Sequence, residues 1–337
     1  MDFDLSDDQI SLRDSARDLL DNYASAARVR AHTESHDAYD SALWNAMVDQ
    51  GWPAIEVAEA HGGVGLGTVE AVLLAEEVGR HAAPAPFVPV VLALDALMQA
   101  GESETCARVL AGDTFPCVVW NPNEPVPYAP SADFAIVLTD DGVYAQDLAT
   151  RPRREPAMDL TRELGWLPFD ASHARRIGEN DARERLLNRG ATFACADLLG
   201  SASRALDLAV EYAKDRVQFD RPIGSFQAVK HRCADMLVDV EGMRSTTYWA
   251  AWCLSADDPE VSVAASTAKI WCADASKRVM ASALQVHGGV GFTWEHDLHF
   301  FMKRAQLDQL AFGDAAAHRT RLAALLRPRV EAGESVV

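Results

Sequence analysis

Hydrophobic residues recur every three or four positions through the first and last parts of the chain, as they do in amphipathic helices. Three such stripes are Leu12, Ala16, Leu19, Leu20 and Tyr23; then Leu199, Ala202, Leu206, Ala209 and Ala213; then Phe226, Val229, Cys233, Met236, Val240 and Met243. The third stripe alternates strictly between the two spacings, which is typical of antiparallel packing in a helix bundle. Pro259 favours the start of a further helix, from about Val261 to Leu284.

The pattern changes between residues 113 and 180. Short runs at 115–120, 134–139 and 143–146 are rich in β-branched and aromatic residues, which predicts strands. The sequence Asp140-Asp141-Gly142 predicts a hairpin turn between the last two runs. We therefore expect a mainly α fold with a small central β domain. Its domains would be an N-terminal helical domain (1–112), a β domain (113–180) and a C-terminal helical bundle (181–332).

Charge limits the kinds of partner that the chain can have. The 337 residues include 31 Lys and Arg against 50 Asp and Glu, a net charge of −19. This balance argues against nucleic acid or an anionic membrane as a partner. An anionic ligand would have to be held by local cations and backbone N–H groups.

The cysteines and the N-terminus point to the reducing cytoplasm. Six cysteines show no CxxC spacing, which favours buried thiols over disulfides or a metal site. The N-terminus is acidic and has no apolar signal-peptide core. The longest apolar stretch, 87–100, is interrupted by Pro89 and Asp95 and is too short to span a bilayer. We expect a soluble cytoplasmic protein with no metal.

Two segments carry the chemistry. Residues 216–231, between two helical patterns, contain Arg216, Phe219 and Gln227, and residues 285–292 contain Gln285 followed by the pair 288–289. A cation, an aromatic ring, two carboxamides and a Gly-Gly turn suit a nucleotide diphosphate, because guanidinium groups and exposed backbone N–H groups both bind phosphate oxygens. Taken alone, Arg216 is more often a helix-end charge, and a Gly-Gly pair more often ends a helix.

Two other features have plainer readings. The sequence at 61–67, His-Gly-Gly-Val-Gly-Leu-Gly, is glycine-rich, but no strand pattern precedes it, so a dinucleotide-binding loop is not expected there. His287 is expected to be a packed, hydrogen-bonded histidine and not a catalytic one.

The two segments together resemble the C-terminal flavin-binding pattern of the acyl-CoA dehydrogenase family. The resemblance covers nearly the whole chain and includes the stretches 51–80, 234–236 and 292–304. It implies FAD as cofactor, with Arg216, Phe219, Gln227 and Gln285 contacting it together with Gly288 and Gly289. One departure is Asp220, where the family usually has glycine; an acid there would lie near the phosphates.

The carboxylate base expected in this family is missing. The reaction needs a carboxylate to take the α-proton of the thioester while flavin N5 receives the β-hydride. The family usually carries a Glu in a Tyr-Glu-Gly-Thr stretch, which corresponds here to residues 311–314, Ala-Phe-Gly-Asp. Anchoring on Arg319 places Phe312 at the Glu position. The position used by other members falls near Arg189 or Gly190, again not a carboxylate.

Asp314 remains a candidate base if the register of the loop shifts, although a solvated loop acid is the commoner role for such a residue. Glu184 and Glu295 are weaker candidates. The family's Tyr-x-x-Thr-Glu-Pro-x-x-Gly-Ser-Asp segment, which holds the flavin ring, has no counterpart in residues 113–135, and residues 151–177 resemble only the later part of that domain. The β domain is therefore a shortened one.

What is present and what is missing suggest half of a cofactor site. Within the family, the chain looks most like the shorter subunits of the two-subunit dehydrogenases of bacterial steroid catabolism. That resemblance implies an α2β2 assembly with a homologous catalytic subunit. It also implies a steroid acyl-CoA substrate and electron transfer to an electron-transfer flavoprotein. Two alternatives stay open: a self-sufficient dehydrogenase or oxidase with Asp314 as base, and an inactive binding or scaffold protein.

Overall fold

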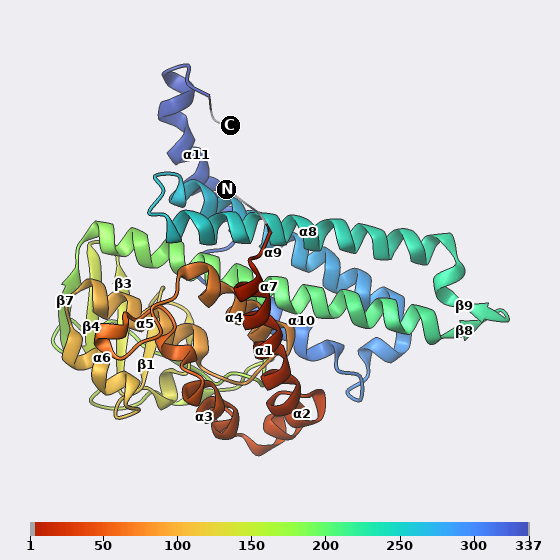
Figure 1. Cartoon of the computed structure of the whole chain (residues 1–337), viewed down its shortest axis with the longest axis horizontal. Helices are drawn as coiled ribbons and strands as arrows, with labels where there is room; N and C mark the ends of the chain where they lie inside the picture. Colours follow the sequence, from red (N-terminus) through yellow and green to blue (C-terminus); the bar gives the residue numbers. More distant parts are fainter. Residues whose placement is uncertain (1–3, 336–337) are drawn as a thin grey trace. The chain divides into compact units, whose positions relative to one another are not determined.

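The computed structural model describes residues 4–335, which form a mainly helical fold with a small β region (Figure 1). This confirms the fold class. The helices are α1 (Asp7–Tyr23), α2 (Ala26–Ser35), α3 (Ser41–Asp49), α4 (Thr68–Arg80), α5 (Phe87–Gln99), α6 (Ser103–Leu110), α7 (Asn180–Asp215), α8 (Gln227–Ser255), α9 (Val261–His287), α10 (Leu298–Asp308) and α11 (Ala315–Glu331). The strands are β1 (Pro116–Val119), β2 (Pro125–Pro127), β3 (Phe134–Thr139), β4 (Gly142–Asp147), β5 (Arg154–Glu155), β6 (Leu164–Trp166), β7 (Ala174–Gly178), β8 (Val217–Gln218) and β9 (Arg221–Pro222).

The chain divides into two compact units. One contains residues 4–6, Glu76–Ala82 and 191–335, and the other contains Asp7–Ala75 and Ala83–Gly190. We call them the bundle unit and the mixed unit. The units cut through α4 and α7, whereas the three domains expected from the sequence follow changes in secondary structure, so the domain boundaries stay a prediction.

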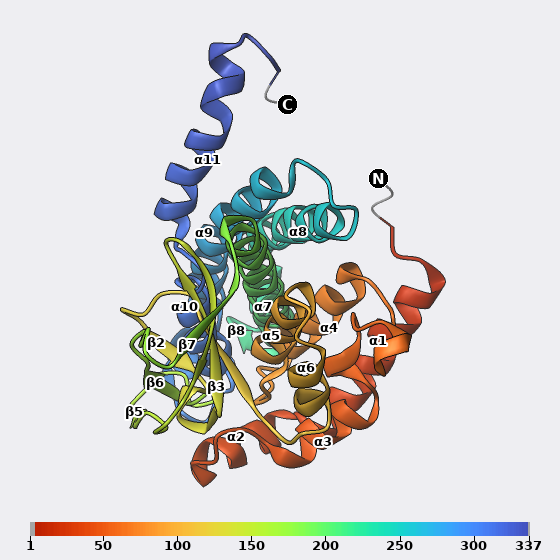
Figure 2. The same ribbon diagram turned by 90° about the vertical axis from the view of Figure 1, so that its left-hand side faces the viewer.

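The mixed unit holds the predicted strands. β1 pairs in parallel with β3, and the antiparallel pairs β3–β4 and β4–β7 complete a four-stranded sheet. Thr139 pairs with Gly142 across the predicted hairpin turn. Figure 2 shows the second sheet, β2, β6 and β5, gathered at one side of this unit. The loop at 62–67 follows a 3-10 helix, Glu59–His61, so no strand precedes it and the dinucleotide-loop interpretation stays excluded.

The bundle unit is built on the predicted stripes. The stripe from Leu199 to Ala213 is buried along α7, and on α8 Met236, Val240 and Met243 are at most 2% exposed. α8 and α9 run antiparallel in close contact, and Gly242 of α8 lets the Trp271 ring of α9 approach its backbone. The helix predicted from Pro259 begins at Val261, as expected.

The end of α4 is fixed to α7 by close backbone contact. A Cβ on Gly79 would lie 2.2 Å from the carbonyl oxygen of Asp197, and one on Gly200 would lie 1.9 Å from that of Glu76. Only glycine permits this approach. The Ser201 hydroxyl also donates to the Gly79 carbonyl at 3.1 Å. These contacts explain why a short piece of α4 belongs to the bundle unit.

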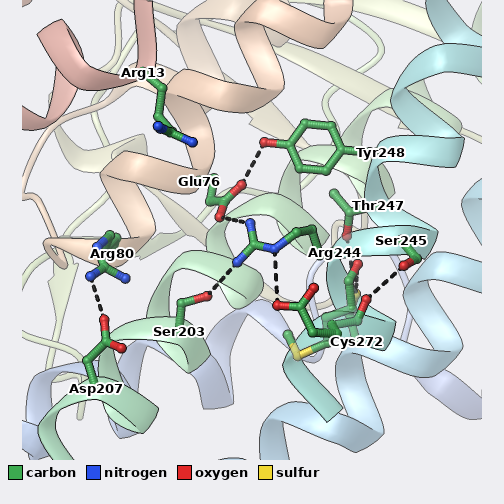
Figure 3. A network of polar contacts seen from close by, with 12 residues as sticks. Arg13, Glu76, Arg80, Ser203, Asp207, Arg244, Ser245, Thr247, Tyr248 and Cys272 are labelled. Atoms are coloured by element: carbon green, nitrogen blue, oxygen red, sulfur yellow. Dashed lines mark hydrogen bonds and ion pairs between the residues drawn. The ribbon is translucent and has the colours of Figure 1, made fainter. Parts of the chain in front are cut away.

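A polar network ties the same piece of α4 to α8 (Figure 3). Arg244 and the Tyr248 hydroxyl each donate to the buried Glu76 carboxylate at 2.6 Å. Burial, and then the Glu76 charge, raise the pKa of Tyr248 well above its usual value. Arg80 forms a further ion pair with Asp207 of α7. The end of α4 is therefore tied by polar contacts to both α7 and α8.

A second buried pair fixes α10 on α7. The guanidinium of Arg304 donates two bonds of 2.7 Å to the carboxylate of Asp197, and both side chains are almost fully buried. Such bidentate pairs fix orientation as well as distance.

Across residues 4–335, no helix is both long and apolar enough to cross a membrane.

Candidate cofactor-binding site

The first predicted segment forms a short hairpin that projects beyond the ends of α7 and α8 (Figure 1). Arg216 follows the last residue of α7, and its carbonyl accepts the N–H of Ile223 at 2.8 Å, which closes the base of the hairpin. The two turn residues, Phe219 and Asp220, have φ angles of 53° and 60°. Two residues of positive φ are what a tight I′ turn requires, and this explains why the family favours glycine at the position of Asp220.

An aromatic anchor supports the tip of the hairpin. Phe226, directly before α8, meets the Phe219 ring edge-on at 6.1 Å between centroids. The Arg221 guanidinium lies 4.1 Å from the centre of the same Phe226 ring. Phe219 itself is 85% exposed. Phe226 thus holds both an exposed ring and a cation in place.

The second segment ends α9. Gly288 has φ 60° and ψ −139°, a conformation that suits glycine, and its N–H donates to the Leu284 carbonyl. That N–H is therefore used by the helix and is not available to a phosphate. A Cβ on either Gly288 or Gly289 would meet no atom within 4 Å, so the turn faces open space. Gln285, in the last turn of α9, is exposed.

The structure brings the two segments together. The ring of Tyr212, one turn before Arg216, lies 4.9 Å from the ring of His287, next to the Gly-Gly turn. Along the antiparallel α8 and α9, Arg278 bonds to Asp239. Because the two helices run in opposite directions, the start of α8 lies next to the end of α9. Gln227 and the Gly-Gly turn are therefore at the same end of the helix pair.

His287 has a structural position. It is 3% exposed, and its Nδ1 pairs with the Ala283 carbonyl at 2.8 Å, so this nitrogen carries the proton. The His296 ring packs against it at 4.4 Å. This agrees with the expectation of a packed, hydrogen-bonded side chain. His287 therefore supports the turn from inside the bundle unit.

The donor set suits the diphosphate and adenosine half of FAD. Arg216 forms no ion pair among residues 4–335, and its side chain is exposed, together with those of Phe219, Gln227 and Gln285. Guanidinium and carboxamide groups donate to phosphate and hydroxyl oxygens, and an aromatic face packs on a flat ring. All of these side chains are exposed and are therefore accessible to a ligand from solvent.

The loop at the expected position of the base carries no free inward carboxylate. Asp314 is exposed and accepts the N–H of Ala317 at 2.8 Å, which makes it the N-cap of α11. Phe312 is buried with a φ of 57°. Its carbonyl pairs with Nε2 of the buried His318 at 2.9 Å. Burial, above all, lowers the pKa of His318 to about 4.

Lys269 fixes the start of the same loop. Its buried ammonium donates to the carbonyls of Asp308 and Gln309 at 2.5 and 3.2 Å, at the C-terminal end of α10. Burial lowers the pKa of Lys269. Lys269 and His318 together fix the conformation of residues 308–314, the loop in which Phe312 stands at the position expected for the base.

The other positions considered for a base have other roles. Arg189 is 1% exposed and donates to Glu56 and to Thr68. Glu184 pairs with Arg183 at 2.8 Å. Glu295 is an exposed residue in the turn before α10.

Sequence reasoning missed the residues that support the site. The sequence marks Phe226 only as the first member of an apolar stripe, and it gives Tyr212 no role. Their spacing holds the only clue: Tyr212 lies four residues before Arg216, and Phe226 is the first member of the α8 stripe.

Two family models and several known proteins match the chain. The model of the acyl-CoA dehydrogenase N-terminal domain matches residues 6–112, and that of the C-terminal domain matches residues 178–326. The acyl-CoA dehydrogenase IpdE2 of Mycolicibacterium smegmatis is 35% identical over 95% of this chain and 99% of its own length. Acyl-CoA dehydrogenase FadE27 of Mycobacterium tuberculosis is 30% identical over 90% of this chain and 94% of its own.

Solved structures match the fold of the chain as well. The ChsE4-ChsE5 complex from Mycobacterium tuberculosis contains a chain that matches with a TM-score of 0.87 and 29% identity, over 97% of this chain and 99% of that one. The Tcur3481-Tcur3483 steroid ACAD G363A variant matches with a TM-score of 0.85 and 27% identity, over 96% and 99%. The chain therefore belongs to the acyl-CoA dehydrogenase family.

Proposed function

We propose that this chain is one subunit of a heteromeric, FAD-dependent acyl-CoA dehydrogenase. It completes the FAD site of a homologous catalytic subunit by binding the diphosphate and adenosine half of the cofactor. When bound, FAD would supply the hydride-accepting chemistry for oxidation of the α,β-bond of a CoA thioester. The partner would supply the carboxylate base and the pocket for the flavin ring.

One observation carries this proposal. The residues of both segments gather at one exposed end of the bundle unit, while the loop that carries the base in the family holds a buried Phe312 and a helix-capping Asp314. A complete site would need both parts. An exposed half of a site suits an interface.

The start of α8 supports an interface at the same end. The hydrophobic stripe of α8 is buried from Met236 onward, but Phe226, Val229 and Cys233 are only half-buried. An apolar stripe that continues beyond its own core suits contact with another chain.

Each residue of the site would have its own task. Arg216 would hold phosphate oxygens through its forked guanidinium, and Phe219 would pack its exposed ring on the adenosine half. Gln227 and Gln285 would donate to hydroxyl and phosphate oxygens. Gly288 and Gly289 would keep the turn open, so that the cofactor can approach the backbone.

The assembly and substrate of the relatives fit this role. The matched structures include one named as a complex of two chains and one named as a steroid ACAD. We therefore propose an α2β2 assembly with two FAD, a steroid-derived acyl-CoA as substrate, an electron-transfer flavoprotein as acceptor, and the cytoplasm as location.

Replacing Arg216 tests the proposal. In the complex co-expressed with the product of an adjacent dehydrogenase gene, Arg216→Ala should weaken FAD binding about 10–100-fold, because a charge-assisted bond to phosphate is lost. Arg327→Ala is the matched control, since Arg327 is an exposed arginine of α11 without an ion pair in the described chain. Bound FAD is measured from flavin absorbance per mole of complex. An unchanged FAD content in Arg216→Ala would contradict the assignment.

A further inference from the structure

Five cations gather around the hairpin without acidic partners. We call Lys214, Arg216, Arg221, Lys230 and Arg232 the basic end of the bundle unit. All five side chains are exposed, and none forms an ion pair with a carboxylate in the described part of the chain. Elsewhere ion pairs are common, as in Arg278 with Asp239 and Arg329 with Glu260. A chain of net charge −19 therefore leaves one positive surface unneutralised.

The acids nearby do not change this. Asp215, Asp220 and Asp235 lie in or next to the same segment, but none of them pairs with a cation among residues 4–335. The start of α8 adds further positive potential. Its first turn has no acidic residue and its N-cap, Phe226, supplies no side-chain bond, so the helix dipole there is not balanced.

The basic end carries more positive charge than one cofactor needs. A diphosphate carries about two negative charges, which two or three close cations can neutralise. Lys230 and Arg232 also lie further along α8 than Gln227. At about 1.5 Å per residue, Arg232 is roughly 7 Å beyond Gln227 along the helix, and it points from a different face than Lys230. Arg232 therefore lies on a different face of α8 from Gln227, beyond the site proposed for the diphosphate.

We propose that the basic end docks on an acidic surface of the partner subunit that lies beside the FAD diphosphate. Arg216 faces the cofactor, and Lys230 and Arg232 face partner carboxylates. This rests on the proposed function and adds the chemistry of the partner's surface. Complementary charge of this kind raises the rate of association and selects the partner over a second copy of this acidic chain.

The surroundings favour a protein over a nucleic acid. Val217 and Phe219, which are 53% and 85% exposed, lie between the cations, and exposed apolar side chains suit a protein interface. Outside the basic end, the excess of acidic over basic residues is larger still, so the remaining surface would repel an extended polyanion. The positive surface is confined to one hairpin and two helix ends.

Chemical cross-linking gives the first test. The co-expressed complex is treated with a carbodiimide, which joins a lysine amine directly to a carboxylate, and the products are identified by mass spectrometry. We expect Lys230 or Lys214 joined to Asp or Glu of the other chain. Links from these lysines to their own chain alone would overturn the proposal.

Charge reversal gives the second test. The double variant Lys230→Glu with Arg232→Glu should weaken subunit association at least 10-fold at low salt and flatten its salt dependence, with FAD per assembled complex unchanged. The control Arg327→Glu should do neither. Association equal to wild type at every salt concentration, or an equal loss in the control, would overturn the proposal. Co-purifying nucleic acid that the double variant loses would overturn it in favour of a nucleic-acid surface.

The two proposals fail in different ways. If Arg216→Ala lowers FAD content while the double variant associates normally, the cofactor role stands and the acidic docking surface is wrong. If the double variant weakens association but Arg216→Ala keeps its FAD, the docking surface stands and the cofactor assignment is wrong.

Discussion

The ring of Tyr212 lies 4.9 Å from the ring of His287, and this contact joins two segments that are far apart in the sequence. Tyr212 precedes the Arg216 hairpin by one helical turn, and the N–H of Arg216 donates to the Tyr212 carbonyl at 2.8 Å. His287 directly precedes the Gly-Gly turn. The pair therefore fixes the hairpin relative to the Gly-Gly turn, which are the two parts of the proposed cofactor site.

Tyr212→Ala should weaken FAD binding although Tyr212 is not one of the proposed FAD contacts. Removing the ring leaves a gap beside the buried His287 and frees the hairpin from the Gly-Gly turn; we expect a loss of about 1–3 kcal/mol in stability and a several-fold weaker FAD affinity. Tyr212→Phe keeps the ring and should bind FAD like wild type. Equal affinity for FAD in the alanine and phenylalanine variants, measured by flavin fluorescence titration, would show that the contact does not matter.

Asp220→Gly should tighten FAD binding. A non-glycine residue at a φ of 60° costs about 1 kcal/mol, and its carboxylate lies close to the proposed phosphate site. Asp220→Asn removes the charge but keeps a residue that tolerates positive φ. We expect affinity to increase several-fold in both variants and thermal stability to rise only in the glycine variant. Weaker FAD binding in both variants would mean that the acid contributes to the site.

Substitutions of Asp314 distinguish a structural role from a catalytic one. As the N-cap of α11, it can be replaced by Asn, which caps equally well, whereas Asp314→Ala should lower stability by about 1 kcal/mol. Activity of the complex with acyl-CoA should be unchanged in Asp314→Asn, because the partner carries the base. A loss of two or more orders of magnitude in kcat in that variant would support the alternative of a self-sufficient enzyme.

His318 should make stability depend on pH below neutrality. Burial lowers the pKa of His318 from 6.5 to about 4 in the folded chain, so between those values the unfolded chain binds more protons. Its contribution is therefore complete above pH 6.5 and is lost as pH falls toward 4, by up to about 3 kcal/mol. Urea unfolding at pH 7 and pH 5 should show a larger drop in wild type than in His318→Gln. Equal drops would contradict this cause.

The sequence predicted the elements with strong periodic patterns. β3 begins and ends where the run 134–139 does, and α9 starts at Val261 after Pro259, because a buried strand and a helix start have local causes. The fold class could be predicted for the same reason, whereas the family was predicted from the resemblance of residues 216–231 and 285–292 to its flavin-binding pattern. The piece of α4 that belongs to the bundle unit could not be predicted, since it depends on Gly79 lying against the backbone of Asp197 and Gly200 lying against that of Glu76.

The site was predictable only in its exposed part. Arg216 and the Gly-Gly turn are residue types that suit a diphosphate, so they can be recognised in the sequence. The groups that hold them, such as Phe226 beneath Phe219 and Arg221, are ordinary aromatic residues whose role appears only in three dimensions. The Gly288 N–H was expected to serve a phosphate, but it closes the end of α9.

Counting FAD per chain tests the central claim most directly. The chain is co-expressed with the dehydrogenase subunit encoded by an adjacent gene, and the complex is purified. Released flavin is then measured against the amount of each chain. The account predicts about one FAD for every two chains, and almost none on this chain expressed alone. One FAD per chain, or a yellow homo-oligomer of this chain that is reduced by an acyl-CoA, would contradict it.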